Sequence, residues 1–366
     1  MSSPANIRIA AVVGARPNFM KVGPVVLELR RRGCVPHLIH TGQHYDAAMS
    51  AVFFDELALP MPDVHLGVGS GSHATQTAAI MTALEDLWSR ERPDLVLVAG
   101  DVNSTLAGAL VAAKLCIPLG HIESGLRSFD RTMPEEINRI VTDAVADLLF
   151  TTEPSGDRHL AREGVPAAKV HRVGNCMIDT LLSHLDRVLA AEPWRAHGVW
   201  PGSYGLVTLH RPANVDDPAA LERTMAMLAD IARQLPLVFP VHPRTRARLG
   251  VVTRSGLSLC EPLPYGAFAG LMAKAKFVLT DSGGVQEETT ALGVPCVTMR
   301  DNTERPITVD VGTNVLAGTD PAQVARIVQD TLRAPRAGRV PDLWDGKAAI
   351  RVVDVIERWW CARSCR

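Results

Sequence analysis

The 366-residue chain has little lysine, few aromatic residues and no surplus of charge of either sign. Only six of its 38 cationic residues are lysine, aromatic residues make up 5 %, and the formal net charge is −1. A near-neutral chain has no general attraction for nucleic acid or anionic lipid, so we expect neither as a partner. No apolar run approaches the roughly 20 residues of a membrane-spanning helix. The strand-like segment 7–13 follows the N-terminus almost directly, so we expect neither a signal peptide nor a membrane anchor.

The seven cysteines are odd in number, scattered along the chain and form no C-x-x-C pair. This distribution argues against a disulfide framework or a structural zinc site, and it is typical of proteins in a reducing cytoplasm. The sequence has no H-E-x-x-H metal motif, no phosphate-binding P-loop and no G-x-G-x-x-G turn after its first expected strand. We therefore expect a cytoplasmic protein that uses neither a metal nor a bound cofactor.

Short apolar runs alternate with longer segments of helical spacing from one end of the chain to the other. Continuous apolar runs are typical of strands buried on both faces, and their alternation with helices predicts parallel, doubly wound sheets. The runs expected to form strands are 7–13, 35–41, 95–99, 117–121, 148–151, 205–209, 237–241, 276–280, 295–299 and 314–316. The segments with helical spacing are 22–32, 74–90, 104–115, 134–147, 178–189, 217–234 and 321–333.

This alternation weakens over residues 176–203, where a helical segment leads into stretches that contain Pro and Trp. We interpret that region as a connection between two Rossmann-like α/β domains. The first domain is expected over 1–175 and the second over 204–347, with a cleft between them. The C-terminal segment, about 348–366, has helical spacing and is expected to pack back on the first domain.

Acidic residues of the first domain stand where strands end or helices begin. Asp101 and Glu123 each follow an expected strand, and Glu135 opens a helix. An isolated acid in such a place is more often a cap or a surface residue. Because ligands of open parallel sheets bind beyond the carboxyl ends of the strands, three acids on that side are candidates for one site. Clustered carboxylates raise one another's pKa, which suits general acid and base chemistry near neutral pH.

Cations and glycines at other strand ends suit an anionic ligand. Arg16 and Lys21 follow the first strand, where they can meet a phosphate or stand in an ordinary solvated turn. In the second domain a strand leads into the run 282–284 (Ser-Gly-Gly) and then a helix, whose free N–H groups suit a pyrophosphate. Close packing of helix on sheet is the other explanation of the glycine pair. Glu288, about one turn further, can accept hydrogen bonds from ribose hydroxyls.

Two histidines, His210 and His242, follow expected strands of the second domain. A lone histidine after a strand is more often structural than catalytic. Two of them on the domain that carries the expected anion site are candidates for the same site.

In sequence order, eight segments resemble the non-hydrolysing UDP-N-acetylglucosamine 2-epimerase family, whose fold is glycosyltransferase-B-like. They are GARPNFMK (14–21), TGQHYD (41–46), GDVNSTLA (100–107), HIESGLRSFDRTMPEEINR (121–139), LHRPANVD (209–216), VHPR (241–244), LTDSGGVQEE (279–288) and MRDNTERP (299–306). They span nearly the whole chain and several are long and unusual, so they are specific for the family. Hydrolysing relatives share much of the pattern, so the segments are less specific for the reaction.

The resemblance implies a homodimer that interconverts UDP-GlcNAc and UDP-ManNAc in two steps. UDP is eliminated across C1–C2 to leave 2-acetamidoglucal, and it re-adds after protonation of C2 on the opposite face. The residues that match the family's acidic positions and its active-site histidine are Asp101, Glu123, Glu135 and His210. The residues that match UDP- and sugar-binding positions are Arg16, Lys21, Ser282, Gly283, Gly284, Glu288 and Arg305.

A second UDP-GlcNAc binds beside the substrate as an activator in many bacterial members. The residues that match positions used for it are Gln43, Glu136, Arg211 and His242. Asp46 stands where those members carry glutamine, and the loop between Glu123 and Glu135 is shorter, which weighs against activation here. The stretch 212–214 (Pro-Ala-Asn) also replaces a glutamate that many relatives carry after His-Arg.

Three other functions are compatible with these residues. A hydrolysing 2-epimerase would release UDP and free N-acetylmannosamine if water intercepts the glucal. A glycosyltransferase of the same fold would transfer the sugar to an acceptor, but it leaves the three clustered acids unexplained. A non-catalytic UDP-sugar sensor would need neither the acids nor His210.

Overall fold

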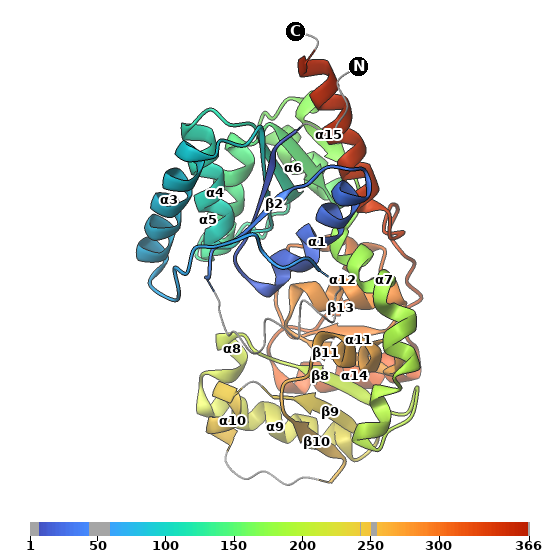
Figure 1. The fold of residues 1–366 in the computed structure, drawn as a ribbon. Helices are drawn as coiled ribbons and strands as arrows, with labels where there is room; N and C mark the ends of the chain where they lie inside the picture. Colours follow the sequence, from blue (N-terminus) through green and yellow to red (C-terminus); the bar gives the residue numbers. More distant parts are fainter. Residues whose placement is uncertain (1–6, 44–58, 242, 250–254, 365–366) are drawn as a thin grey trace. The chain divides into compact units, whose positions relative to one another are not determined.

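The computed structural model describes residues 7–43, 59–241, 243–249 and 255–364, and the chain divides into two compact units (Figure 1). Unit 1 comprises Met1–Thr180 and Asp342–Arg366, and unit 2 comprises Leu181–Pro341. Each unit is built on one parallel β-sheet between layers of helices, so the expected fold class is confirmed. In the part of the chain that is described, no helix is both long and apolar enough to cross a membrane.

The sheet of unit 1 has seven parallel strands in the order β3-β2-β1-β4-β5-β6-β7. The strands are β1 (Ile9–Val13), β2 (His37–His40), β3 (Val64–His65), β4 (Leu95–Ala99), β5 (Leu119–Ser124), β6 (Leu148–Thr151) and β7 (Val170–Arg172). Parallel neighbours need a crossover connection, and most of the crossovers here are helices. The central strands β1 and β4 are buried at every position, which explains their continuous apolar sequence.

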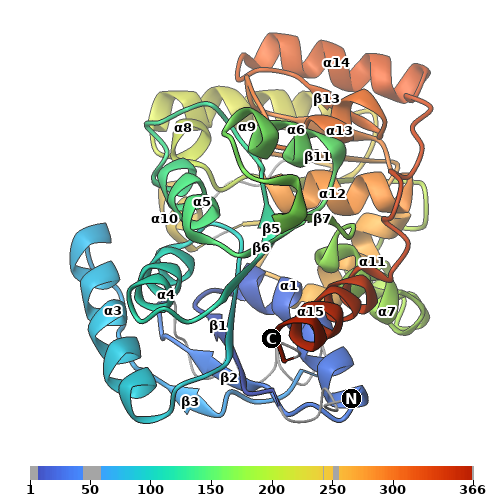
Figure 2. The same cartoon turned by 90° about the horizontal axis from the view of Figure 1, so that it is seen from above.

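The helices of unit 1 cover both faces of this sheet. They are α1 (Arg16–Arg31), α3 (His73–Arg90), α4 (Asn103–Lys114), α5 (Pro134–Val145), α6 (Pro154–Arg162), α7 (Cys176–Ala190), which runs on into unit 2, and α15 (Ala348–Ser364). A short 3-10 turn, η2 (Ala167–Lys169), precedes β7. Figure 2 shows α3, α4 and α5 side by side along one face, where they bury Ile80, Leu84 and Trp88 of α3 against the sheet.

The C-terminal helix α15 packs on unit 1, where it lies against α1 (Figure 2). Arg32, the residue that follows α1, pairs with Glu357 of α15 at 2.8 Å. The carboxylate of Asp179 accepts hydrogen bonds from the backbone N–H groups of Ala348 and Ala349 at 3.1 and 2.7 Å. These N–H groups have no partner inside the helix, so Asp179 of α7 stabilises the point at which α15 begins.

The sheet of unit 2 has six parallel strands in the order β10-β9-β8-β11-β12-β13. The strands are β8 (Gly205–Thr208), β9 (Leu237–Pro240), β10 (Leu257–Cys260), β11 (Phe277–Thr280), β12 (Cys296–Thr298) and β13 (Asn314–Leu316). The helices are η3 (Pro193–His197), α8 (Pro212–Val215), α9 (Pro218–Ala232), α10 (Pro243–Leu249), α11 (Tyr265–Lys274), α12 (Gly283–Leu292), α13 (Pro306–Asp310) and α14 (Pro321–Arg333).

Successive residues of these strands point to opposite faces, and each face has its own core. Val207, Phe239 and Leu279 lie on the face that α9 and α14 cover. Leu206 and Val278 lie on the other face, with residues of α11, α12 and η3. Both faces are therefore apolar, which leaves the strand ends as the places where polar residues gather.

Candidate active site

Each sheet reverses its strand order once, and most candidate residues lie at those two points. In unit 1 the order reverses between β1 and β4, and in unit 2 between β8 and β11. Loops that leave such strands in opposite directions open a crevice at the carboxyl edge of the sheet, which is the usual ligand site of open α/β folds. Residues 14–21 and 100–101 follow β1 and β4, and residues 209–211 and 281–284 follow β8 and β11.

Lys21 and Glu123 form a buried ion pair at the carboxyl edge of the unit 1 sheet. Lys21 Nζ lies 2.6 Å from Glu123 Oε1, and the two side chains are 7 % and 3 % exposed. Glu123 has a φ of +67°, in the left-handed region that costs a non-glycine residue about 1–3 kcal/mol. It lies where β5 shifts register against β6. A shift of this kind re-aims a side chain out of the regular alternation of the strand.

Gly100 leaves room for this ion pair. Its φ is +65°, and a Cβ at this position would lie 3.0 Å from Lys21 Nζ. Asn18 joins the two strand ends beside it: its Oδ1 accepts from Gly14 N at 3.2 Å, and its Nδ2 donates to Ala99 O at 2.9 Å. The turn after β1 and the end of β4 are thus held together around the lysine.

Helix α5 positions Asp101. Arg139 donates to Asp101 Oδ2 at 2.5 Å, and Asn138 Nδ2 donates to the Asp101 carbonyl at 2.8 Å. The Asp101 side chain is 22 % exposed, so its carboxylate is anchored by Arg139 and still partly accessible. Glu135, in the first turn of the same helix, is half-buried.

Asp101 and Glu135 line one cavity of about 220 Å³. The other residues that line it are Gln43, Ser70, Gly71, His73, Gln76, Val102, Asn103, Pro134 and Asn138. Two carboxyl groups on one polar cavity can serve as one proton acceptor and one proton donor. The structure therefore brings two of the three predicted acids to one cavity and places the third, Glu123, beside Lys21.

A buried charged network that the sequence interpretation did not assign holds the backbone on either side of these acids. His121 Nδ1 lies 2.6 Å from Asp143 Oδ1, and His121 Nε2 lies 2.8 Å from the Gly100 carbonyl. Asp143 Oδ2 accepts from Gly125 N at 3.0 Å and pairs with Arg127 at 2.7 Å. Burial alone would raise the pKa of Asp143, but His121 and Arg127 hold it below its usual range. Gly100 precedes Asp101, and Gly125 follows Glu123 by two residues, so the network fixes both acids.

Two of the candidate activator residues are engaged inside unit 1. Buried Glu136 accepts hydrogen bonds from the backbone N–H groups of Ser128 and Phe129, each at 2.9 Å, and pairs with Arg139. Gln43 Oε1 accepts from Ser104 N and Oγ at 3.1 and 2.7 Å. Glu136 thus stabilises the loop at residues 128–129, and Gln43 stabilises the first turn of α4, which follows Asp101. Asp46 and His242 lie outside the described residues, and the activator role stays a prediction.

In unit 2, Asp281 organises the candidate histidine. Its buried carboxylate accepts from the backbone N–H groups of His210 and Arg211, at 3.0 and 2.9 Å, and from Asn214 Nδ2 at 2.9 Å. His210 Nδ1 lies 2.9 Å from Asp281 Oδ1, while the His210 side chain is 53 % exposed. Burial raises the pKa of Asp281, but the hydrogen bonds of His210 and its other donors bring it below its usual value. An exposed imidazole with one nitrogen held by a carboxylate has its other nitrogen available for a ligand.

Charged side chains approach the first turn of α12 closely. Arg305 Nε pairs with Glu287 Oε2 at 2.8 Å, and Arg305 also pairs with Glu304, which Arg300 holds at 2.7 Å. A Cβ on Gly283 would lie 2.5 Å from Arg305 Nη1, so glycine is what admits the guanidinium here. Gly283 therefore allows the close approach of the Arg305 side chain, and the binding of an anion by the N–H groups of the glycine pair stays a prediction.

Three arginines, Arg211, Arg300 and Arg305, lie near one another on this side of unit 2, together with acidic side chains. Burial, and then the charge of Arg300, lower the pKa of Arg211. Arg300 is buried, and its Nη1 finds no hydrogen-bond partner among the described residues. Together with Arg305 and the N-terminus of α12, these guanidinium groups suit a diphosphate.

Glu288 lies one turn into α12, where it is buried against Tyr265. Tyr265 donates its hydroxyl to Glu288 Oε1 at 2.8 Å. Burial raises the pKa of Glu288 to about 7, although this hydrogen bond opposes the rise. The carboxyl group therefore titrates near neutral pH.

Two other predicted binding residues, Arg16 and Ser282, stand at the starts of helices. Arg16 begins α1, but its side chain is not among those described. Ser282 precedes α12 and donates its N–H to Thr280 Oγ1 at 3.0 Å. Among the residues that the structure describes, no three His, Cys, Asp or Glu side chains cluster as metal ligands do. The expectation of a metal-free and cofactor-free reaction stays a prediction.

Comparison with protein families matches residues 28–357 to the family model described as UDP-N-acetylglucosamine 2-epimerase. A UDP-N-acetylglucosamine 2-epimerase of Methanococcus maripaludis is 40 % identical over 361 residues, which are 95 % of this chain and 98 % of the relative. A Pseudomonas aeruginosa protein, UDP-2,3-diacetamido-2,3-dideoxy-D-glucuronate 2-epimerase, is 43 % identical over 320 residues, 85 % of this chain and 88 % of the relative.

Solved structures agree with these matches. The UDP-GlcNAc 2-epimerase of Methanocaldococcus jannaschii in complex with UDP-GlcNAc and UDP is similar with a TM-score of 0.89 and 39 % identity, over 96 % of this chain and all of that one. The Neisseria meningitidis enzyme bound to UDP-GlcNAc has the same TM-score at 29 % identity, over 96 % and 100 % of the two chains.

Proposed function

The chain belongs to the UDP-N-acetylglucosamine 2-epimerase family, and we propose that it interconverts UDP-GlcNAc and UDP-ManNAc without releasing the free sugar. The observation that carries this proposal is the kind of residue found near the two points where the strand order reverses. One has carboxyl groups suited to proton transfer, Asp101, Glu123 and Glu135, and the other has guanidinium groups and a helix N-terminus suited to a diphosphate.

In the proposed reaction, a carboxylate of unit 1 takes the proton from C2 of the sugar. The C1–O bond to UDP breaks, its electron pair leaves with the UDP oxygen, and a C1–C2 double bond forms. UDP then adds back to C1 while a second carboxyl group delivers a proton to the opposite face of C2. The C2 proton is weakly acidic, so this step needs positioned groups on both faces. Asp101 and Glu135 share a cavity, and Glu123 forms a buried ion pair with Lys21.

The UDP part of the substrate is assigned to unit 2. The N–H groups of Gly283 and Gly284, with Arg305, are proposed to hold the diphosphate as its negative charge grows on departure. His210, oriented by Asp281, is proposed to contact the same group. Glu288 is proposed to accept hydrogen bonds from the ribose hydroxyls. Arg16 is proposed to bind the substrate from unit 1.

Product analysis tests this function against the hydrolysing alternative. Purified protein incubated with UDP-GlcNAc should give a mixture of two UDP-sugars, with no free N-acetylmannosamine, by ion-exchange chromatography and ³¹P NMR. Free sugar and UDP as the only products would instead establish a hydrolase. The relative from Pseudomonas aeruginosa is named for another UDP-sugar, so UDP-2,3-diacetamido-2,3-dideoxy-D-glucuronate belongs in the same assay. If the protein turns over that sugar faster, the proposed reaction would stand, but the proposed substrate would be replaced.

UDP binding should depend on the ionisation of Glu288. Because the pKa of Glu288 is about 7, the carboxylate that accepts ribose hydroxyls is mostly protonated at pH 6 and mostly ionised at pH 8. We therefore expect the affinity for UDP to rise about tenfold over that range through this group. Isothermal titration calorimetry at each pH measures it. In Glu288→Gln, UDP affinity should vary with pH only as far as the titration of UDP itself requires. If the variant shows the same dependence of UDP affinity on pH as the parent protein, Glu288 does not bind the ribose as proposed.

The proposal also includes a homodimer in the cytoplasm. Family membership favours the homodimer, and the scattered cysteines favour a reducing compartment.

A further inference from the structure

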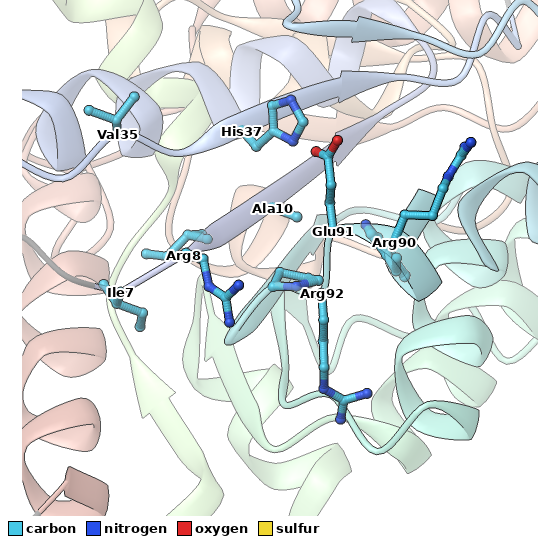
Figure 3. Close-up of a pocket in the computed structure, with 11 residues that line it drawn as sticks. Ile7, Arg8, Ala10, Val35, His37, Arg90, Glu91 and Arg92 are labelled. Atoms are coloured by element: carbon cyan, nitrogen blue, oxygen red, sulfur yellow. The ribbon is translucent and has the colours of Figure 1, made fainter. Parts of the chain in front are cut away.

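A cavity of about 450 Å³ at the amino ends of the unit 1 strands lies apart from the candidate active site (Figure 3). Its walls come from the starts of β1 and β2 and from the segment between α3 and β4. Arg92 Nη2 donates to the Leu115 carbonyl at 2.7 Å, so this guanidinium serves the protein itself. The smaller cavity, which Asp101 and Glu135 line, contains a side chain that is better placed to bind a ligand.

Asn138 lies between the two acids of the smaller cavity. It follows Glu135 by three residues on α5, and residues three apart share one face of a helix. Its Nδ2 donates to the Asp101 carbonyl at 2.8 Å, and it lines the cavity with both acids. The volume, about 220 Å³, is below the range of small-molecule sites, roughly 300–1,000 Å³. The cavity therefore suits one part of a nucleotide sugar, and a group within reach of both acids there lies beside Asn138.

The hydrogen bonds of Asn138 determine which way its amide faces. The Asp101 carbonyl can only accept, so Nδ2 must face it, and Nδ2 also donates to Asn103 Oδ1 at 3.3 Å. The Asn103 amide is fixed in turn, because its Nδ2 donates to Gln76 Oε1 at 2.9 Å. Gln76 is oriented by donating its Nε2 to the Gly69 carbonyl at 2.8 Å. Both hydrogens of Asn138 Nδ2 are therefore used, and its Oδ1 is the atom left to bind an occupant.

Asn138 Oδ1 is an acceptor that has no donor among the described residues, although the residue is only 6 % exposed. It is not one of the partnerless atoms that are sealed from solvent, so it keeps accessible surface. An acceptor in so confined a place favours a ligand that presents an N–H or O–H group to it. An apolar group there would displace water from the oxygen without replacing its hydrogen bond.

We propose that Asn138 recognises the acetamido group on C2 of the sugar, with Oδ1 accepting its N–H. This inference rests on the proposed function, in which Asp101 and Glu135 act on the proton of C2, so that the nitrogen on the same carbon lies beside Asn138. The hydrogen bond also orients C2 between the two carboxyl groups. Asn138 is thus a residue that determines specificity for 2-acetamido sugars.

A ligand that lacks only the N–H tests this contact on the unmodified protein. In UDP-2-deoxy-2-(2-oxopropyl)-glucose, a CH₂ group replaces the N–H of UDP-GlcNAc, while the carbonyl and the methyl group stay. Isothermal titration calorimetry with the full-length protein should give a Kd at least about tenfold higher for this ketone than for UDP-GlcNAc. Epimerisation during the titration keeps the acetamido group, so the comparison holds whether or not UDP-ManNAc forms. Equal Kd values would overturn the proposal.

The variant Asn138→Ala separates recognition of the sugar from a structural role of the side chain. Without Oδ1, it should bind the ketone and UDP-GlcNAc equally, within about twofold, and should bind UDP itself as the parent does. A merely structural role would weaken the binding of both sugars together and keep their ratio, and that result would also overturn the proposal. Gln234→Ala, which removes an exposed amide of unit 2, is the control and should keep the parent ratio.

The outcomes also separate this inference from the proposed function. A protein that binds UDP-GlcNAc more tightly than the ketone but forms no UDP-ManNAc would contradict the epimerase activity and support the Asn138 contact. A protein that forms UDP-ManNAc but binds the two ligands equally would contradict the contact alone.

Discussion

Turnover of UDP-GlcNAc should fall by about two to four orders of magnitude when Asp101 or Glu123 is replaced by its amide, while UDP still binds. An amide keeps the size of the carboxyl group but neither takes nor delivers a proton at neutral pH. The two variants should differ in stability. Asp101 is partly exposed and shares Arg139 with Glu136, so Asp101→Asn should unfold near the parent temperature. Glu123→Gln leaves Lys21 buried without its charged partner, which costs about 3–5 kcal/mol.

Coupled rate assays, thermal unfolding and UDP titration separate these effects. Glu85→Gln is a suitable control because Glu85 is an exposed carboxylate of α3 in the same unit. It should leave rate, stability and UDP binding unchanged. If Asp101→Asn folds, binds UDP and retains the parent rate, Asp101 has no part in proton transfer. The double variant Lys21→Met/Glu123→Gln should recover stability but not turnover, which distinguishes lost chemistry from unfolding.

Asp281→Asn should damage both the stability of unit 2 and the reaction. The carboxylate accepts from three N–H donors and from the His210 side chain. An asparagine would turn its own NH₂ group toward some of these donors. We expect a loss of about 3–5 kcal/mol in the free energy of unfolding, because the partners of a buried charge stay behind. With His210 no longer oriented, turnover should also fall, by about a hundredfold or more.

Urea unfolding and steady-state kinetics at several pH values measure this prediction. The lowered pKa of Asp281 makes its stabilising contribution complete above the ordinary aspartate pKa, about 4, and weaker as the pH falls below it. The difference in stability between parent and variant should therefore shrink in acid. Asp230→Asn is the control, since Asp230 makes an exposed pair with Arg233 and should cost about 1 kcal/mol or less. A variant as stable as this control would show that Asp281 does not organise the His210 loop.

Helices with clear ends and strands with continuous apolar runs could be predicted from the sequence. The expected helix 321–333 is confirmed at both ends as α14, where Asp320 caps Gln323 N and Pro321 opens the first turn. The expected strand 95–99 is confirmed as β4. The helix expected over 134–147 ends earlier, at Val145, because Ala146 has an extended backbone.

The strands that the apolar pattern missed are short or alternating. β3 has two residues, and β7 is the edge strand Val-His-Arg, so neither contains an apolar run. β10, Leu-Ser-Leu-Cys, alternates apolar with polar or small residues and is only partly buried. A strand at the edge of a sheet can have a short or alternating sequence, because one or both of its faces need not be buried along the whole strand.

Part of the candidate site could be anticipated because strand ends are predictable. The chain positions of Asp101, Glu123 and His210 follow from the strands before them. Asp281 and the pair His121–Asp143 could not be assigned, since their roles depend on donors that lie 71 and 22 residues away. The left-handed backbone of Glu123 also has no sequence signal, because it arises from the register shift between β5 and β6.

The central claim is that the chain breaks and re-forms the C2–H bond of a UDP-linked sugar without losing UDP from the product. Incubation of UDP-GlcNAc with the protein in D₂O, followed by ¹H NMR, tests it most directly. The account predicts that deuterium replaces the C2 proton in the UDP-ManNAc formed and, at equilibrium, in UDP-GlcNAc as well. Retention of the C2 proton in both sugars, or accumulation of free N-acetylmannosamine and UDP, would contradict it.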